Sequence, residues 1–214
     1  MALFVLVPGA GGMAWYWHRA VPLIRAAGHQ PIAVDLPGDD RYAGLAAYAD
    51  IVTRAIAERS DVILVAQSLA GFTVPLVCAR APVRTVVFVN AMIPRPGETA
   101  GAWWGATAAV EAREQAAAQR GYATEFDVGT YFLHDVPQDV LHAGPEQPRG
   151  KPRPFSASPV ASSAGPTSPF MFLREETTVF SRSNFNDVSR VSGSERRWRK
   201  SLAVISSGCQ IRKS

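Results

Sequence analysis

Short apolar runs alternate with longer amphipathic segments over the first ninety residues. Continuous apolar runs of about five residues are typical of strands buried on both faces, and they occupy residues 3–7, 31–34, 62–66 and 85–89. Apolar positions recur at helical spacing between these runs, in residues 21–27, 45–59 and 69–81. Strands joined by helical crossovers lie parallel, so the pattern predicts a doubly wound, mostly parallel α/β sheet covered by helices.

The pattern is helical again from about residue 92 to residue 146. Residues 108–121 (AAVEAREQAAAQRG) are rich in helix formers and end at Gly121, and a shorter helix is expected over 137–143. Because no strand separates these helices, we expect a helical cap over the strand ends. Trp103 and Trp104 either line a substrate pocket under this cap or belong to the core.

Composition changes sharply near Gln147. Residues 1–146 contain 10 Arg and no Lys against 14 Asp and Glu, whereas residues 147–214 contain 12 Lys and Arg against 4 acidic residues. Serine occurs only at Ser60 and Ser68 before this point and fourteen times after it. We therefore predict a core with its cap in 1–146 and a Ser/Arg/Pro-rich tail in 147–214, disordered or translated from a shifted reading frame. In this tail FMFL (170–173) and LAVI (202–205) are too short and isolated to specify a domain.

The formal charge of +4 does not indicate a nucleic-acid-binding surface, because the basic excess lies in the tail. No apolar run is long enough to span a membrane, and the first residues lack the basic region of a signal peptide. Two cysteines cannot form a disulfide framework, so a reducing, cytoplasmic setting is expected.

A glycine loop follows the first predicted strand. Gly9, Gly11 and Ala14 fit G-x-G-x-x-A, and Asp35 ends the next strand at the spacing of a dinucleotide site. An NAD-binding oxidoreductase or epimerase that uses the GAGGMA loop and Asp35 is therefore one alternative. Aromatic residues 15–17 argue against it, because they crowd the point where a phosphate-binding helix should begin.

A second motif lies where the third predicted strand meets a helix, in VILVAQSLAG (62–71). This is the setting of a nucleophile elbow, usually G-x-S-x-G, in which small residues flank a serine in a strained conformation. Ala66 and Ala70 hold the two flanking positions around Ser68. The other interpretation of Ser68 is a cap for the helix that follows.

Together the loop and the elbow resemble those of small α/β-hydrolase-fold enzymes, including the plant methylesterase and hydroxynitrile lyase group and bacterial esterase-like hydrolases. FVLVPGA, the W-x-W of residues 15–17 and VAQSLAG carry the resemblance, which spans about residues 3–146. It implies Ser68 as nucleophile, the backbone N–H groups of Ala10 and Leu69 as an oxyanion hole, a small ester-type substrate, and no metal or organic cofactor. Pro8 and Gln67 stand where the family has histidines, neither of which belongs to the triad.

The resemblance also implies an acid and a histidine after the nucleophile, and the chain supplies neither in the expected place. No histidine follows His142, and Asn90 occupies a strand end where some relatives carry an acid. We therefore expect a hydrolase fold truncated at its C-terminal side, with weak or absent activity, and a non-catalytic remnant is the third interpretation. An incomplete sheet would leave an open edge and favour self-association.

Overall fold

The computed structural model describes residues 1–144 and 170–173. The chain divides into two compact units, Met1–Val179 and Phe180–Ser214, and all the described residues belong to the first. Most of the predicted tail, including LAVI, therefore lies outside the described residues.

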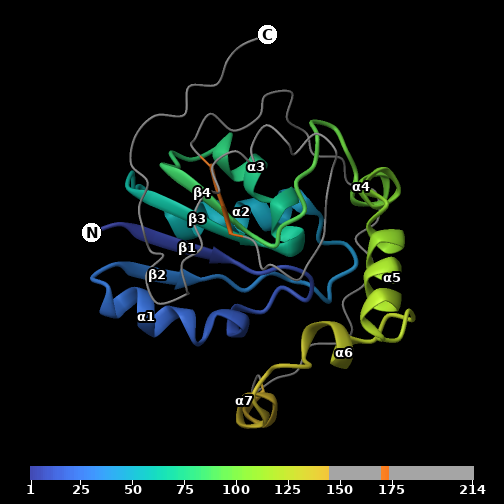
Figure 1. The fold of residues 1–214 in the computed structure, drawn as a ribbon. Coiled ribbons are helices and arrows are strands. Elements are labelled where there is room, and N and C mark those ends of the chain that lie inside the picture. The colour runs from blue at the N-terminus through green and yellow to red at the C-terminus, as the bar shows by residue number, and fades with distance from the viewer. Residues whose placement is uncertain (145–169, 174–214) are drawn as a thin grey trace. The chain divides into compact units, whose positions relative to one another are not determined.

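Five parallel strands form one sheet in the order β2-β1-β3-β4-β5 (Figure 1). They are β1 (Leu3–Val7), β2 (Gln30–Ala33), β3 (Val62–Gln67), β4 (Thr85–Val89) and β5 (Phe170–Leu173). The first four match the predicted strands to within a residue at either end. The predicted doubly wound α/β sheet is confirmed.

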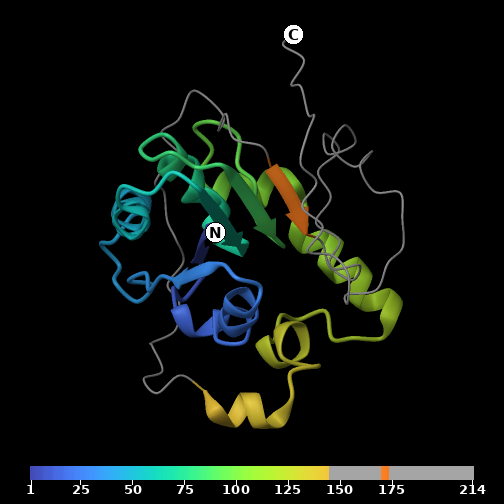
Figure 2. The same cartoon turned by 90° about the vertical axis from the view of Figure 1, so that its left-hand side faces the viewer.

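The fifth strand is formed by FMFL, a segment too short to specify a domain by itself. β5 pairs in parallel with β4, in the register Val86 with Phe170 through Val89 with Leu173, and the two run side by side in Figure 2. A four-residue run carries little pattern of its own, because its place is determined by the neighbouring strand more than eighty residues earlier. The sheet is thus one strand wider than the sequence predicts.

Successive side chains of a strand point to opposite faces of the sheet, so these apolar strands form two apolar layers, one on each face. Leu3, Val5 and Val7 of β1 pack into the larger core cluster, whereas Phe4 and Leu6 pack into the smaller one. Helices α2 (Leu45–Ile56) and α3 (Val74–Cys78) cover the larger cluster. On the other face, Trp17 of the 3₁₀ helix η1 (Ala14–Trp17) and residues of α1 (Ala20–Ala26) cover the smaller cluster (Figure 1).

Two of these helices end earlier than predicted. α2 stops at Ile56 rather than residue 59, because Ala57 adopts φ 51° and ψ −135°, which cannot continue a helix. The predicted helix over 69–81 is wrong as a single element. It divides into the 3₁₀ helix η2 (Ser68–Phe72) and α3, with Pro75 in the first turn of α3, where its missing N–H is not needed.

Between β4 and residue 144 the structure describes four helices: α4 (Ala100–Thr107), α5 (Ala109–Arg120), α6 (Val128–Phe132) and α7 (Gln138–Ala143). The predictions for α5 and α7 are confirmed, and Gly121 ends α5 with φ 74°. α4 and α6 were not predicted. Figure 1 shows α4 and α5 on the side toward which β1 points, and the proposed function of these helices as a cap stays a prediction.

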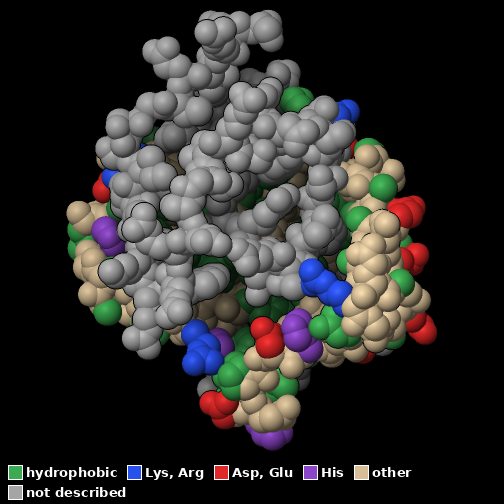
Figure 3. Space-filling model, in the orientation of Figure 1, with side chains coloured by type: hydrophobic (Ala, Val, Ile, Leu, Met, Phe, Trp, Pro, Cys, Tyr) green, Lys and Arg blue, Asp and Glu red, His purple; other side chains and the backbone are tan. Residues whose placement is uncertain are grey.

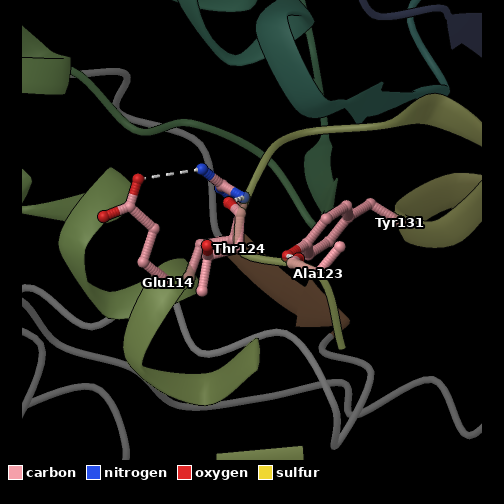
Figure 4. A network of polar contacts seen from close by, with 5 residues as sticks. Glu114, Ala123, Thr124 and Tyr131 are labelled. Atoms are coloured by element: carbon pink, nitrogen blue, oxygen red, sulfur yellow. Dashed lines mark hydrogen bonds and ion pairs between the residues drawn. The ribbon is translucent and has the colours of Figure 1, made fainter. Parts of the chain in front are cut away.

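Arg113 ties α5 to the segment before α6 (Figure 4). Its guanidinium donates to the Thr124 carbonyl at 2.7 Å and forms an ion pair with Glu114 at 3.4 Å. The Tyr131 hydroxyl donates to the Ala123 carbonyl, and the Tyr131 ring lies 5.0 Å from the guanidinium. These contacts hold a segment whose large apolar residues, Tyr122, Phe126, Val128 and Phe132, are exposed rather than buried in the core.

Candidate active site

Ser68 lies at a sharp turn between a buried strand and a helical segment. β3 ends at Gln67, η2 begins at Ser68, and Ser68 has a φ of 51°. A positive φ is strained for a residue with a side chain, and such strain gathers at functional sites. The strand-to-helix turn expected of an elbow is therefore present, and the half-buried Ser68 is the residue that takes the strained conformation.

The segment after β4 supports the turn from one side. The Met92 N–H donates to the Ser68 carbonyl at 3.0 Å. A Cβ at Gly71 would lie 1.8 Å from the Met92 carbonyl oxygen, so only glycine fits this approach. The buried Ala66 and Ala70 complete the small-residue surroundings of Ser68.

The glycine loop after β1 reaches the same place. A Cβ at Gly9 would lie 2.8 Å from the Ser68 Cβ and 3.3 Å from its Oγ, so this loop touches the serine side chain. The Gly9 N–H donates to the Gln67 Oε1 at 3.1 Å. Two motifs separated by 58 positions in the sequence are thus brought into direct contact.

The two backbone donors named from the resemblance flank this contact. Ala10 follows Gly9 and is exposed, and its N–H makes no hydrogen bond with any residue that the structure describes. Leu69 lies in the first turn of η2, where backbone N–H groups lack a partner within the helix.

A model of the alpha/beta hydrolase family matches residues 4–205. This chain belongs to the alpha/beta hydrolase family. The match extends past residue 146, where the motif-based resemblance ends. The topology agrees, because the family's nucleophile follows a central parallel strand, as Ser68 follows β3 between β1 and β4.

Relatives within this family include proteins named as esterases. The chain is similar to Probable esterase PIR7A of Oryza sativa subsp. indica, 34% identical over 110 residues, which cover 46% of this chain and 42% of the rice protein. It is also similar to Methyl jasmonate esterase 1 of Vitis vinifera, 33% identical over 105 residues, covering 44% of this chain and 40% of that protein. The matched segment is thus less than half the length of either relative.

A solved structure extends the likeness of fold over more of the chain. An extracellular alpha/beta-hydrolase from a Paenibacillus species superposes with a TM-score of 0.56, at 17% sequence identity, over 81% of this chain and 78% of that one. At this identity the likeness concerns the fold alone.

Histidines in the described part of this family member do not contact Ser68. The His18 ring stacks on Trp15 with centroids 4.4 Å apart, and its Nδ1 lies 2.9 Å from the Trp15 carbonyl oxygen. His29 accepts a hydrogen bond from the Ala2 N–H, and His134 and His142 are exposed. Within residues 1–144 no hydrogen bond joins the Ser68 Oγ to any of these histidines.

Asn90 directly follows β4, with a φ of 44° and an exposed position. It remains an amide where some relatives carry an acid, and it takes no part in proton transfer.

Cys78 also carries a nucleophilic group, a thiol, and burial raises the pKa of this thiol to about 11. Cys78 is therefore protonated at neutral pH and does not compete with a reactive serine.

The two adjacent tryptophans have different environments. Trp103 is only 5% exposed, belongs to the larger core cluster and donates from its indole N–H to the Ile93 carbonyl at 3.1 Å. Trp104 is 42% exposed and meets Trp103 edge-on. The core interpretation thus fits Trp103, and the pocket role of both residues stays a prediction.

A narrow apolar crevice lies beside the glycine loop. It is lined by Pro8, Gly9, Leu45, Tyr48, Leu69, Ala70 and Thr73, and it is too tight to admit a water molecule. The space between these residues is too small to hold a substrate.

The geometry does not favour the dinucleotide alternative. The Asp35 Oδ1 accepts a hydrogen bond from the Ala14 N–H at 3.0 Å, which ties the end of β2 to the loop. The loop leads into the four-residue η1, and no α-helix begins where a pyrophosphate would need one. No comparison with known proteins supports this alternative either.

The described residues contain no group of three or more His, Cys, Asp or Glu side chains placed to hold a metal ion. None of their helices has the length and apolar character needed to cross a lipid bilayer.

Proposed function

We propose that the site of this chain is built for hydrolysis of an ester or a related acyl compound, with Ser68 as nucleophile. The observation that carries the proposal is the strained Ser68 at the end of β3, with the glycine loop packed against its side chain. The esterase names of two relatives support the class of substrate. Because those matches cover less than half of each relative, the activity of this chain is a proposal.

Each group has a defined role in the proposed reaction. The Ser68 Oγ attacks the acyl carbon, its proton passes to a base, and the carbonyl electron pair moves onto oxygen. The N–H groups of Ala10 and Leu69 stabilise that oxyanion. The tetrahedral intermediate then collapses, releasing the alcohol, and water hydrolyses the acyl-serine to regenerate Ser68 and a carboxylic acid.

The reaction needs a base that takes the Ser68 proton, and no histidine in the described residues is hydrogen-bonded to Ser68. A serine hydroxyl is a weak nucleophile without a histidine to take its proton. We therefore propose that a full-length relative carrying an acid and a late histidine hydrolyses esters, whereas this 214-residue chain is weakly active or inactive. Loss of the base alone leaves the oxyanion donors, which account for a residual acceleration of about 10³-fold in serine hydrolases.

Hydrolysis of p-nitrophenyl acetate tests the proposal in both proteins. In the full-length relative, we expect the equivalent of Ser68→Ala to leave only the residual rate that the oxyanion donors support, whereas Ser68→Ala should change the already low rate of this chain little. Ser60→Ala is the matched control, because Ser60 is the other serine of residues 1–146 and is exposed. Equal rates for wild type and Ser68→Ala in the relative would overturn the proposal. High activity of this chain that depends on His134 or His142 would overturn the account of the missing base.

A further inference from the structure

Gln67 is the residue directly before Ser68, and its side chain leaves the elbow to reach the glycine loop. The Gln67 Oε1 accepts the Gly9 N–H at 3.1 Å in a half-buried setting. Pro8 has no N–H, so Gly9 carries the first backbone donor of this loop. Gln67 stands where the family has a histidine, and this contact gives its side chain a structural role.

Both polar groups of Gly9 are fixed, one by Gln67 and one by the loop itself. The Gly12 N–H donates to the Gly9 carbonyl at 3.1 Å, which closes a turn over residues 9–12. Ala10 is the second residue of that turn, and peptide planarity couples its N–H direction to the orientation of Gly9. Anchoring Gly9 at both ends therefore determines where the Ala10 N–H points.

Gly9 also lies in close contact with Ser68. A Cβ added at Gly9 would lie only 2.8 Å from the Ser68 Cβ, so the loop has little room to shift toward the elbow. On its inner side the loop lies beside Leu45 and Tyr48, with no room for a water molecule between them. Gln67 supplies the remaining restraint, a hydrogen bond from the elbow itself.

We propose that Gln67 is a positioning residue, which holds the Ala10 N–H in place for the oxyanion by binding the Gly9 N–H. This inference rests on the proposed function of the site. A neutral amide suits the task, because it accepts the hydrogen bond without placing a negative charge beside a developing oxyanion. A carboxylate at the same place would keep the hydrogen bond and oppose the oxyanion electrostatically.

Two substitutions in the full chain separate these effects. Gln67→Leu removes the acceptor, and Gln67→Glu keeps it and adds a titratable charge. Gln115→Leu on α5 is the matched control, because Gln115 is exposed and lies outside the site. Circular dichroism verifies that each variant is folded.

Hydrogen exchange of the Gly9 amide, followed by NMR, is the first measurement. We expect exchange to accelerate about 5-fold in Gln67→Leu, the amount that one net hydrogen bond contributes, and to stay at the wild-type rate in Gln67→Glu and Gln115→Leu. Unchanged exchange in a folded Gln67→Leu variant would overturn the inference, because Gly9 would then be held without Gln67.

Ester hydrolysis is the second measurement and tests the catalytic consequence. Displacing one oxyanion donor should lower kcat of Gln67→Leu about 10- to 100-fold with KM nearly unchanged. The kcat of Gln67→Glu should fall as rising pH ionises its carboxyl group. A kcat in Gln67→Leu equal to wild type would overturn the positioning role. A wild-type chain no faster than Ser68→Ala is the inactive outcome expected without a base, and Gly9 exchange then decides whether Gln67 holds the loop. The proposed function itself fails only if the full-length relative is also no faster than its own serine-to-alanine variant.

Discussion

Single residues at the elbow occupy positions that other side chains could not. Ser68 takes a positive φ, Gly9 touches the Ser68 side chain, and Gly71 lies against the Met92 carbonyl. The sequence predicted Ser68 and the small residues around it, because the elbow motif encodes their steric requirements locally. It could not show that Gln67 binds Gly9, because that contact depends on the pairing of β1 with β3.

A substitution at Gly71 tests the steric part of this description. In Gly71→Ala the new methyl group would overlap the Met92 carbonyl, so the backbone after β4 must move away from the Ser68 carbonyl that it now contacts. We expect a loss of about 1–3 kcal/mol in the free energy of unfolding, measured by urea denaturation.

Gly101→Ala is the control for this experiment. Gly101 lies within α4, and a Cβ there meets nothing within 4 Å. Alanine favours a helix interior over glycine, so this variant should gain roughly 0.5–1 kcal/mol. Equal destabilisation by both substitutions would show that the Met92 carbonyl does not lie as close to Gly71 as described.

At the scale of elements, the sequence predicted those strands and helices best in which a continuous run of apolar or helix-forming residues marks the whole element. The apolar runs of β1 and β4 and the helix formers of α5, with Gly121 at its end, identify these elements directly. α4 was missed because its two glycines weaken the helical pattern. Its position depends on Trp103 packing in the core and on the Thr99 cap.

The shortest helices and strands depend on individual contacts, which the pattern of apolar and polar residues does not predict. α6 has five residues and is capped by Asp127, whose carboxylate accepts the Thr130 N–H at 2.7 Å. β5 has four residues and is identified by its pairing with β4. Glu175 and Glu176 follow β5 in the sequence and lie outside the described residues.

The cap of α6 leads to a pH-dependent prediction. The hydrogen bond from the Thr130 backbone N–H holds the pKa of Asp127 below its ordinary value of 3.8. A lowered pKa in the folded state stabilises the structure above the unfolded-state pKa, and this contribution disappears as pH falls through the folded-state pKa. The cap should therefore be intact at neutral pH and weaken in acid below about pH 4.

An NMR titration of the Asp127 carboxyl carbon and the Thr130 amide measures this change. Both signals should titrate together, with a midpoint below the ordinary aspartate value. Asp127→Asn should remove the titration of the Thr130 amide. A Thr130 amide that titrates in the same way in Asp127→Asn would contradict the assignment of the cap.

At the scale of the whole molecule, the change in charge near Gln147 does not coincide with an end of the family match, which continues to residue 205. The acidic excess of residues 1–146 is visible on the surface along α5 in Figure 3, whereas the basic excess belongs to residues 147–214. The boundary near Gln147 and the shifted reading frame stay predictions. The family match to residue 205 and the pairing of β5 with β4 are the observations that the reading-frame hypothesis must accommodate.

Covalent labelling of the full chain with a fluorophosphonate tests the central claim most directly. The phosphoryl group resembles the tetrahedral intermediate, so its adduct at Ser68 would place an oxygen beside the Ala10 and Leu69 N–H groups. The modified serine is located by peptide mass spectrometry, with Ser68→Ala and Ser60→Ala as the test and matched control. We predict slow labelling that is selective for Ser68, lost in Ser68→Ala and retained in Ser60→Ala. Labelling spread over many serines, or unchanged in Ser68→Ala, would contradict the account.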